Sequence, residues 1–149
     1  MFNKTRLYAV TKRLSELDED LVWLSVVDKE EFSEQFVKWI QEQLQEGKDG
    51  NNKFMGFYAN SGRKDYGAIY NQGDPYDLKN TGDFYNSMFL VALKNQLILE
   101  ADAQKDEDNL YQKYGQAITK LNAENFEKLK QEVKHGYILY VKQLLAATR

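Results

Sequence analysis

The sequence predicts an α+β fold with N-terminal helices, a small antiparallel sheet with a central hairpin, and a long C-terminal helix. Apolar residues recur every three or four positions in two N-terminal stretches and again over residues 126–144, which is the period of one helix face. The apolar runs 88–93 and 96–102 are joined by the polar pair Lys94 and Asn95, which is typical of a β-hairpin. These patterns favour helices packed against a small sheet.

Length and composition bound the class of protein. The 149 residues suit a single domain, residues 1–149. A chain of this length buries roughly 70% of the surface of its unfolded state, so a core forms without disulfides or metals. The absence of cysteine excludes zinc–thiolate sites, thiol catalysis and a disulfide framework. No cofactor and no metal site are expected.

The charge pattern bounds the partners. The net charge is −3, and acidic and basic residues are interspersed, without the basic stripe of a nucleic-acid-binding surface. No apolar run approaches the roughly 18 residues that a membrane span requires. Residues 1–6 start with positive charge, but no apolar region follows, so they do not resemble a secretory signal. We expect no membrane partner and no sequence-specific nucleic-acid partner.

Aromatic residues make up 13% of the chain. Tyr and Trp are enriched at subunit interfaces, where one surface is half apolar and half wet. A small core that uses aromatic side chains as filler explains the same composition, so composition alone leaves both interpretations open.

The N-terminal third predicts helices. Leu7, Val10, Leu14 and Leu17 share one helix face. The apolar run 21–27 is rich in β-branched residues and fits either a strand or a buried helix; the flanking helical patterns favour a helix.

The next helix covers residues 32–44, where apolar side chains follow helical spacing. Asp28 is its expected N-cap, and Glu30 and Glu31 lie in the first turn, where the helix dipole favours acids. The cluster 48–52 that follows is the best candidate for a flexible loop.

Residues 53–76 are the least regular part of the chain. Residues 54–59 fit a short strand, and residues 61–65 fit a turn. Long irregular segments inside a compact domain are usually functional or mobile. The sequence therefore predicts that residues 48–76 form a mobile or interface loop region.

The hairpin follows a short helical turn over residues 83–87, with Asn80 or Thr81 as its cap. The first strand, 88–93, is apolar on both faces, so we expect both faces to be covered. The second, 96–102, mixes polar with apolar positions.

The C-terminal part predicts an acidic loop over residues 104–109 and a short helix over 110–115. Asn122 is the expected cap of the final helix, with Asn125 a weaker candidate, and the helix should reach residue 147. Gly136 costs this helix about 1 kcal/mol relative to Ala, and close packing is the only reason that we can give for it.

Candidate chemical groups all have simpler explanations. His135 is the only histidine, and its place in the final helix indicates a solvated surface residue. The carboxylates of Asp102, Asp106 and Asp108 are of the kind that Ca²⁺ or Mg²⁺ accepts, but the spacing of an EF-hand is missing, and a solvated acidic loop explains them.

Three further carboxylates deserve the same comparison. Asp74, Asp77 and Asp83 form a possible general acid and base set, but turn and cap roles explain each of them. Arg63 and Lys64 form a small basic spot that fits a solvated turn. The glycines between residues 56 and 73 form no nucleotide-binding fingerprint. We therefore expect no catalytic and no cofactor-binding residues.

Residues 77–88 resemble the Leu-x-x-Thr-Gly-x-Leu-x-x-Ser-Ile signature of tailed-phage neck and tail-completion proteins. The matching positions are Leu78, Thr81, Gly82, Phe84, Ser87 and Met88, with Phe84 in place of an aliphatic residue and Met88 in place of Ile. The order of elements is also similar over roughly residues 28–147. The chain looks like proteins of phages of Bacteroides-type hosts, including the crAss-like group.

This resemblance implies a structural virion protein and not an enzyme. Such proteins form homo-oligomeric rings of the neck or head–tail connector between portal and tail, and contact portal, tail or other neck proteins. The implied location is the virion, assembled in the host cytoplasm, with DNA passing through the channel of the ring. A closed ring needs two different patches on each subunit. The residues expected at one of them are Phe57, Tyr58, Tyr66, Tyr70, Pro75, Tyr76, Phe84 and Tyr85.

Two other functions remain open at this point. A phage-encoded interaction module would bind one host protein in a one-to-one complex. A small hydrolase would depend on Asp74, Asp77, Asp83 or Asp102, but no nucleophile and base accompany these carboxylates.

Overall fold

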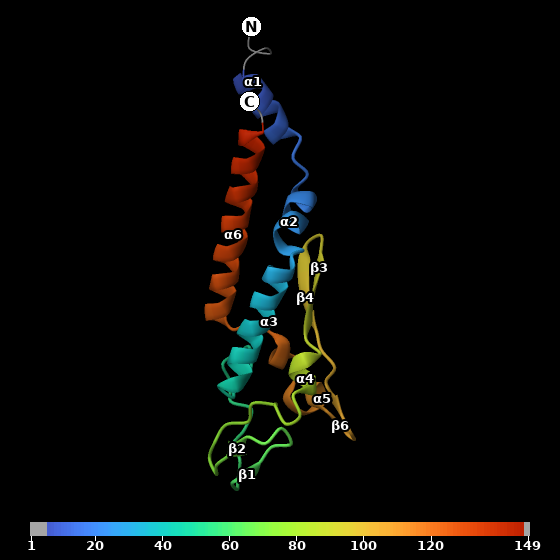
Figure 1. Cartoon of the computed structure of the whole chain (residues 1–149), viewed down its shortest axis with the longest axis vertical. Helices are drawn as coiled ribbons and strands as arrows, with labels where there is room; N and C mark the ends of the chain where they lie inside the picture. The colour runs from blue at the N-terminus through green and yellow to red at the C-terminus, as the bar shows by residue number, and fades with distance from the viewer. Residues whose placement is uncertain (1–5, 148–149) are drawn as a thin grey trace.

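A computed structural model describes residues 6–147 of the chain, an elongated arrangement of helices with small two-stranded sheets (Figure 1). The helices are α1 (Arg6–Ser15), α2 (Glu19–Val27), α3 (Glu30–Gln45), α4 (Asp83–Asn86), α5 (Leu110–Tyr114), the 3₁₀ helix η2 (Gln116–Thr119) and α6 (Ala123–Ala146). The strands are β1 (Gly62–Arg63), β2 (Ile69–Tyr70), β3 (Phe89–Leu93), β4 (Gln96–Glu100), β5 (Gln104–Lys105) and β6 (Asp108–Asn109). The predicted α+β class is confirmed.

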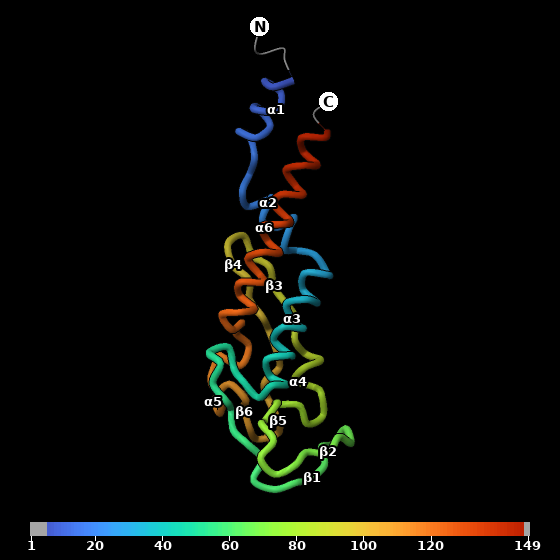
Figure 2. Tube along the Cα trace, turned by 90° about the vertical axis from the view of Figure 1, so that its left-hand side faces the viewer, coloured from blue at the N-terminus to red at the C-terminus, as the bar shows by residue number. Residues whose placement is uncertain are grey.

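The long helices run along the long axis of the molecule. α2 and α3 follow one another, and α6 lies beside α2 (Figure 1). α1 and the end of α6 extend beyond the hairpin at one end of the molecule, while the irregular segment that contains β1 and β2 lies at the other end (Figure 2). No helix in residues 6–147 is long and apolar enough to cross a membrane.

The core lies on the inner face of α3. Ile40 and Leu44 are completely buried, because helical spacing places them on one side. Phe84, from α4, and Ile118, from η2, pack against them. The expected helix at residues 21–27 is confirmed as α2. Asp28, however, is not the N-cap of α3: it ends α2, and Lys29 occupies the cap position without a side-chain hydrogen bond.

A buried glutamine connects α3 to the start of α6. Gln43 is 3% exposed. Its Nε2 donates to the carbonyl of Lys120 at 2.9 Å, and its Oε1 accepts from the main-chain N–H of Asn122 and from Nδ2 of Asn125. Asn122 caps α6 as expected, with its side chain accepting from the N–H of Asn125. The polar atoms of Gln43 therefore fix where α6 begins.

The predicted hairpin is confirmed, with Val91 opposite Ile98 at its centre. Its first strand is not covered on both faces. Leu90 packs against the core, whereas Phe89 and Leu93 are 54% and 41% exposed. Because successive side chains of a strand point to opposite faces, one face of β3 meets the helices and the other meets solvent. The strand is apolar on both faces, but the chain supplies a cover for only one.

Two other local predictions are wrong. Residues 54–59 form no strand; they make only isolated bridges, in which Phe54 pairs with Lys48 and Phe57 with Pro75. Residues 104–109 are not a simple loop, since β5 and β6 form a small hairpin. Both segments are short and polar or irregular, so local patterns give little signal about their pairing.

The segment 48–52 is a hydrogen-bonded turn packed against the protein. The Asp49 carboxylate accepts from the N–H groups of Asn51 and Lys53, and the N–H of Gly50 donates to the carbonyl of Ala117 at 2.7 Å. A Cβ atom at Gly50 would lie 2.3 Å from the carbonyl oxygen of Lys120. The proposed mobility or interface role of residues 48–76 stays a prediction.

The segment that carries the neck-protein resemblance forms a tight entry to the hairpin. Gly82, at φ 95°, precedes the short helix α4 and occupies its cap position, so neither Asn80 nor Thr81 is the cap. The Thr81 hydroxyl still accepts from the N–H of Asp83 at 3.2 Å. At the other end, the Ser87 hydroxyl donates to the Phe84 carbonyl and accepts from the N–H of Asp102. Ser87 therefore joins the end of α4 to the chain that leaves β4, at the end of the hairpin opposite its turn.

Candidate interaction surfaces

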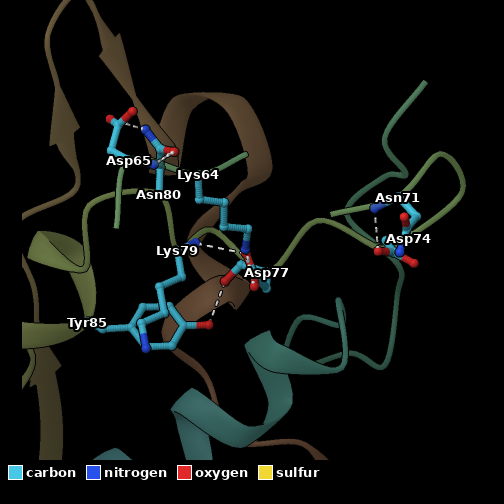
Figure 3. Close-up of polar contacts among 8 residues, drawn as sticks. All are labelled: Lys64, Asp65, Asn71, Asp74, Asp77, Lys79, Asn80 and Tyr85. Carbon is cyan, nitrogen blue, oxygen red and sulfur yellow. Dashed lines mark hydrogen bonds and ion pairs between the residues drawn. The ribbon is translucent and has the colours of Figure 1, made fainter. Parts of the chain in front are cut away.

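A buried ion pair organises the end of the molecule that holds the irregular segment. The Lys64 ammonium contacts both carboxylate oxygens of Asp77, and their side chains are 6% and 19% exposed (Figure 3). Asp77 also accepts from the N–H of Lys79 at 3.0 Å, and its carbonyl accepts from the Tyr85 hydroxyl. Lys64 is therefore not part of a solvated basic turn, as the sequence suggested. It neutralises a carboxylate that would otherwise be costly to bury.

The carboxylates considered as a catalytic set do not converge. Figure 3 shows Asp74 well apart from Asp77, where its carboxylate accepts from the N–H of Asn71 at 2.7 Å. Asp83 accepts from the Thr81 hydroxyl, and Asp102 accepts from the N–H of Gln104. Each carboxylate is engaged in local structure. Within residues 6–147, no group of three or more His, Cys, Asp or Glu side chains is arranged to hold a metal ion.

The aromatic side chains of the irregular segment mostly contact one another. The rings of Tyr58 and Tyr70 stack with centroids 4.0 Å apart, and Tyr76 meets Tyr58 edge-on at 4.7 Å. Phe57 and Tyr66, by contrast, are 50% and 47% exposed. Of the expected interface residues in this segment, Phe57 and Tyr66 therefore offer most surface. Tyr58, Tyr70 and Tyr76 contact one another and hold the segment together.

Two residues expected at the interface belong to the core. Phe84 and Tyr85 are 1% and 4% exposed, so they have almost no surface to offer a partner in this conformation. Burial and the nearby Asp77 carboxylate raise the pKa of the Tyr85 hydroxyl well above its ordinary value. The same two causes raise the pKa of Tyr58 to about 12. Pro75 packs beside Gly47, where a Cβ would lie 2.2 Å from the proline Cβ.

The solvent face of the β3–β4 hairpin carries an apolar cluster, with the polar side chains of Gln96 and Glu100 at its two ends. Phe89, Val91 and Leu93 of β3 lie on it, and the register places Ile98 of β4 beside Val91. We call these four residues the outer hairpin face. Trp23 Nε1 donates to the Leu93 carbonyl at 2.6 Å and so joins the tip of the hairpin to α2. The face is therefore presented on an anchored element.

An apolar groove lies between β4 and α6. Its volume is about 910 Å³. Five consecutive residues of the hairpin, 95–99, line one wall, and α6 provides the other through Ala123, Phe126 and Leu129. Consecutive side chains of a strand point to opposite faces. Because residues from both faces line this groove, the groove runs along the open edge of β4. No third strand pairs with this edge in the described residues. Phe126 is 50% exposed in the groove.

Comparisons of this chain with protein-family models, with curated proteins and with solved structures find no match.

The sequence did not reveal the groove or the outer hairpin face as surfaces. The apolar run of β3 was visible, but which face lacks a cover depends on where α2 and α3 lie. One signal was available: the two strands carry more apolar positions than a two-stranded ribbon can bury on one face.

Proposed function

We propose that this chain is a structural subunit of a tailed-phage virion, which forms part of a neck or head–tail connector ring between portal and tail. The observation that carries the proposal is the outer hairpin face. An anchored hairpin exposes Phe89 at 54% and Leu93 at 41%. Contiguous exposed apolar surface of this kind marks interaction sites in soluble proteins.

Two distinct surfaces suit a subunit that assembles head to tail. The outer hairpin face lies mainly on β3, whereas the groove lies between β4 and α6, and Ile98 borders both. A heterologous contact, which joins two different patches, closes into a ring when the rotation between subunits permits. The resemblance of residues 77–88 to neck proteins supports the position in the virion. The engagement of each candidate carboxylate in local hydrogen bonds supports a non-catalytic role.

The test is the mass of the protein in solution, alone and with the portal protein encoded near it. Native mass spectrometry or light scattering should find a defined oligomer in at least one of these two conditions. Phe89→Ser with Leu93→Ser should abolish that oligomer, because both side chains lose the apolar area that would be buried. Ile138→Ser is the matched control, since Ile138 is 43% exposed on α6 and belongs to neither surface.

A monodisperse monomer in both conditions contradicts the proposal. So does an oligomer that the outer-face variant leaves unchanged. A tight one-to-one complex with a host protein would instead favour an interaction module. Portal, capsid and tail genes beside its own gene would support the virion assignment.

A further inference from the structure

Acidic and basic residues are interspersed over the chain as a whole, but within its first third they separate into a basic and an acidic segment. Residues 1–15 contain Lys4, Arg6, Lys12 and Arg13 and no acidic residue. Residues 16–46, which include α2 and α3, contain ten carboxylates and only two lysines, for a net charge of −8. Since the whole chain has a net charge of −3, the remaining residues 47–149 carry only +1. A basic segment is thus followed directly by an acidic one.

The basic segment contains α1, a helix that its own chain covers only in part, at Tyr8, Ala9 and Val10. None of the ten residues of α1 is buried, although apolar side chains recur along it with helical spacing. Leu7 and Leu14 are 62% and 40% exposed. α1 lies beside the end of α6 and beyond the hairpin in both views (Figures 1 and 2). An amphipathic helix gains most of its stability from packing its apolar side, and the exposed Leu7 and Leu14 leave part of that gain unused within this chain.

A second groove lies on the acidic side of the body. It has a volume of about 290 Å³ and is lined by residues of α3 and α6 and by Val26 near the end of α2. Val26, Phe32 and Trp39 form its apolar floor. Glu31 and Glu132 stand at its rim. The other polar lining residues are Lys29, Gln35 and His135.

Neighbouring charges extend the acidic rim. Glu30 and Glu34 are exposed on α3 beside Glu31, and Asp28 is exposed just before this helix. On the same helix, the Lys38 ammonium is 4.0 Å from the Glu42 carboxylate and is already partly neutralised. The larger groove at β4 has mainly neutral polar groups at its edge, Asn51, Asn52, Asn95 and Gln96. The groove between α3 and α6 is therefore the better match for a basic helix.

We propose that α1 of one copy docks in the groove between α3 and α6 of the next copy. This inference rests on the proposed function and names one of the contacts that would build the ring. Leu7 and Leu14 would contact the apolar floor, while Lys12 and Arg13 would face the carboxylates of Glu31 and Glu34. Ten helical residues span about 15 Å, which is shorter than the 16-residue helix α3. Helix-in-groove docking of this kind is a common mode of recognition.

The contact is heterologous, because the helix and the groove are different patches of the same chain. This makes a specific experiment possible. A donor variant, Lys12→Glu with Arg13→Glu, loses the basic helix but keeps the groove. An acceptor variant, Glu31→Lys with Glu34→Lys, keeps the helix but reverses the rim. Lys53→Glu and Glu107→Lys are matched single controls, since both residues are exposed and lie outside α1 and the groove.

Assembly is measured by native mass spectrometry, for each variant alone and for the two variants mixed, with and without portal. Each variant alone should need at least about tenfold more protein than the wild type to assemble, because charge reversal replaces attraction by repulsion. The mixture should recover assembly with the two variants in equal amounts. The wild-type helix of one variant then meets the wild-type groove of the other, and the reversed helix meets the reversed rim. The wild-type assembly should also weaken between about 0.1 M and 1 M salt, as the Debye length falls from about 10 Å to about 3 Å. The controls should assemble like the wild type.

Three outcomes would overturn the inference while leaving the proposed function intact. One is normal assembly of both variants, with loss only in the outer-hairpin-face variant. The second is a mixture that fails to recover assembly, as expected if α1 folds onto its own chain. The third is a donor variant that still assembles but no longer binds duplex DNA, as expected if the basic residues of α1 contact DNA and not a second copy of the chain. A chain that is monomeric in every condition contradicts the proposed function instead, because all variants then behave alike.

Discussion

Gly136 of α6 lies against Val26 of α2 so closely that a Cβ atom on the glycine would be 2.5 Å from the valine Cγ1. This contact sets how near the two helices approach. It also explains why the long C-terminal helix contains a glycine in spite of the cost of about 1 kcal/mol to helix stability. The close packing that the sequence could only suggest is present in the structure.

Gly136→Ala should destabilise the protein by about 1 kcal/mol. The added methyl group overpacks the contact with Val26, which typically costs about 1 to 3 kcal/mol, while the better helix propensity of Ala returns about 1 kcal/mol. Urea unfolding should show a lower midpoint with an unchanged slope. Gln131→Ala, at an exposed position of the same helix, should change the free energy of unfolding by less than about 0.5 kcal/mol. A stabilised Gly136→Ala variant would contradict the close approach.

Gln43→Ala should destabilise the protein by about 3 kcal/mol. The change leaves the N–H of Asn122 and the side-chain amide of Asn125 without their buried acceptor, and each such group costs about 1 to 3 kcal/mol. Chemical denaturation measures the effect. Gln45→Ala is the control on the same helix, since Gln45 is exposed. Equal stability of the two variants would show that Gln43 does not tie α3 to α6.

Asp77→Asn should destabilise the protein by about 3 kcal/mol, because the Lys64 ammonium is then buried without a counter-charge. Adding Lys64→Met should recover much of this loss, since no unpaired charge remains. Asp74→Asn is the matched control; its carboxylate accepts a main-chain hydrogen bond that an amide oxygen can also accept. Thermal or urea unfolding of the four proteins gives the comparison. A double variant no more stable than Asp77→Asn would argue against a buried charge as the cause.

Stability should fall as the pH rises above 10. The pKa of Tyr58 is raised from 10.0 to about 12 by burial and by the Asp77 carboxylate, so the folded state holds this proton more tightly than the unfolded state. The contribution is fully present below pH 10 and is lost as the pH rises through about 12. Urea unfolding of the wild type and Tyr58→Phe across this range should show a smaller decline in the variant. Identical pH profiles would mean that Tyr58 is not the group responsible.

The sequence by itself determined the helices, the β3–β4 hairpin and the cap of α6 by Asn122. These features depend on neighbours within a few positions: helical spacing, a two-residue turn between apolar runs, and a side chain that reaches the N–H three residues on. Local physics decides them, so they can be read along the chain. Local patterns were insufficient at Asp28. This residue was expected to cap the start of α3, but α2 ends directly before α3, and Asp28 is the C-cap of α2.

Only the tertiary structure decided what these elements expose. Lys64 looked like a solvated turn residue and is buried because Asp77, thirteen residues away, neutralises it. Phe84 and Tyr85 looked like surface contacts and are core, while Phe89 and Leu93 are open. Burial depends on which distant segments lie opposite a side chain, and that information is absent from local spacing. The grooves beside α6 also depend on contacts between distant segments, since each lies between elements that are far apart in the sequence.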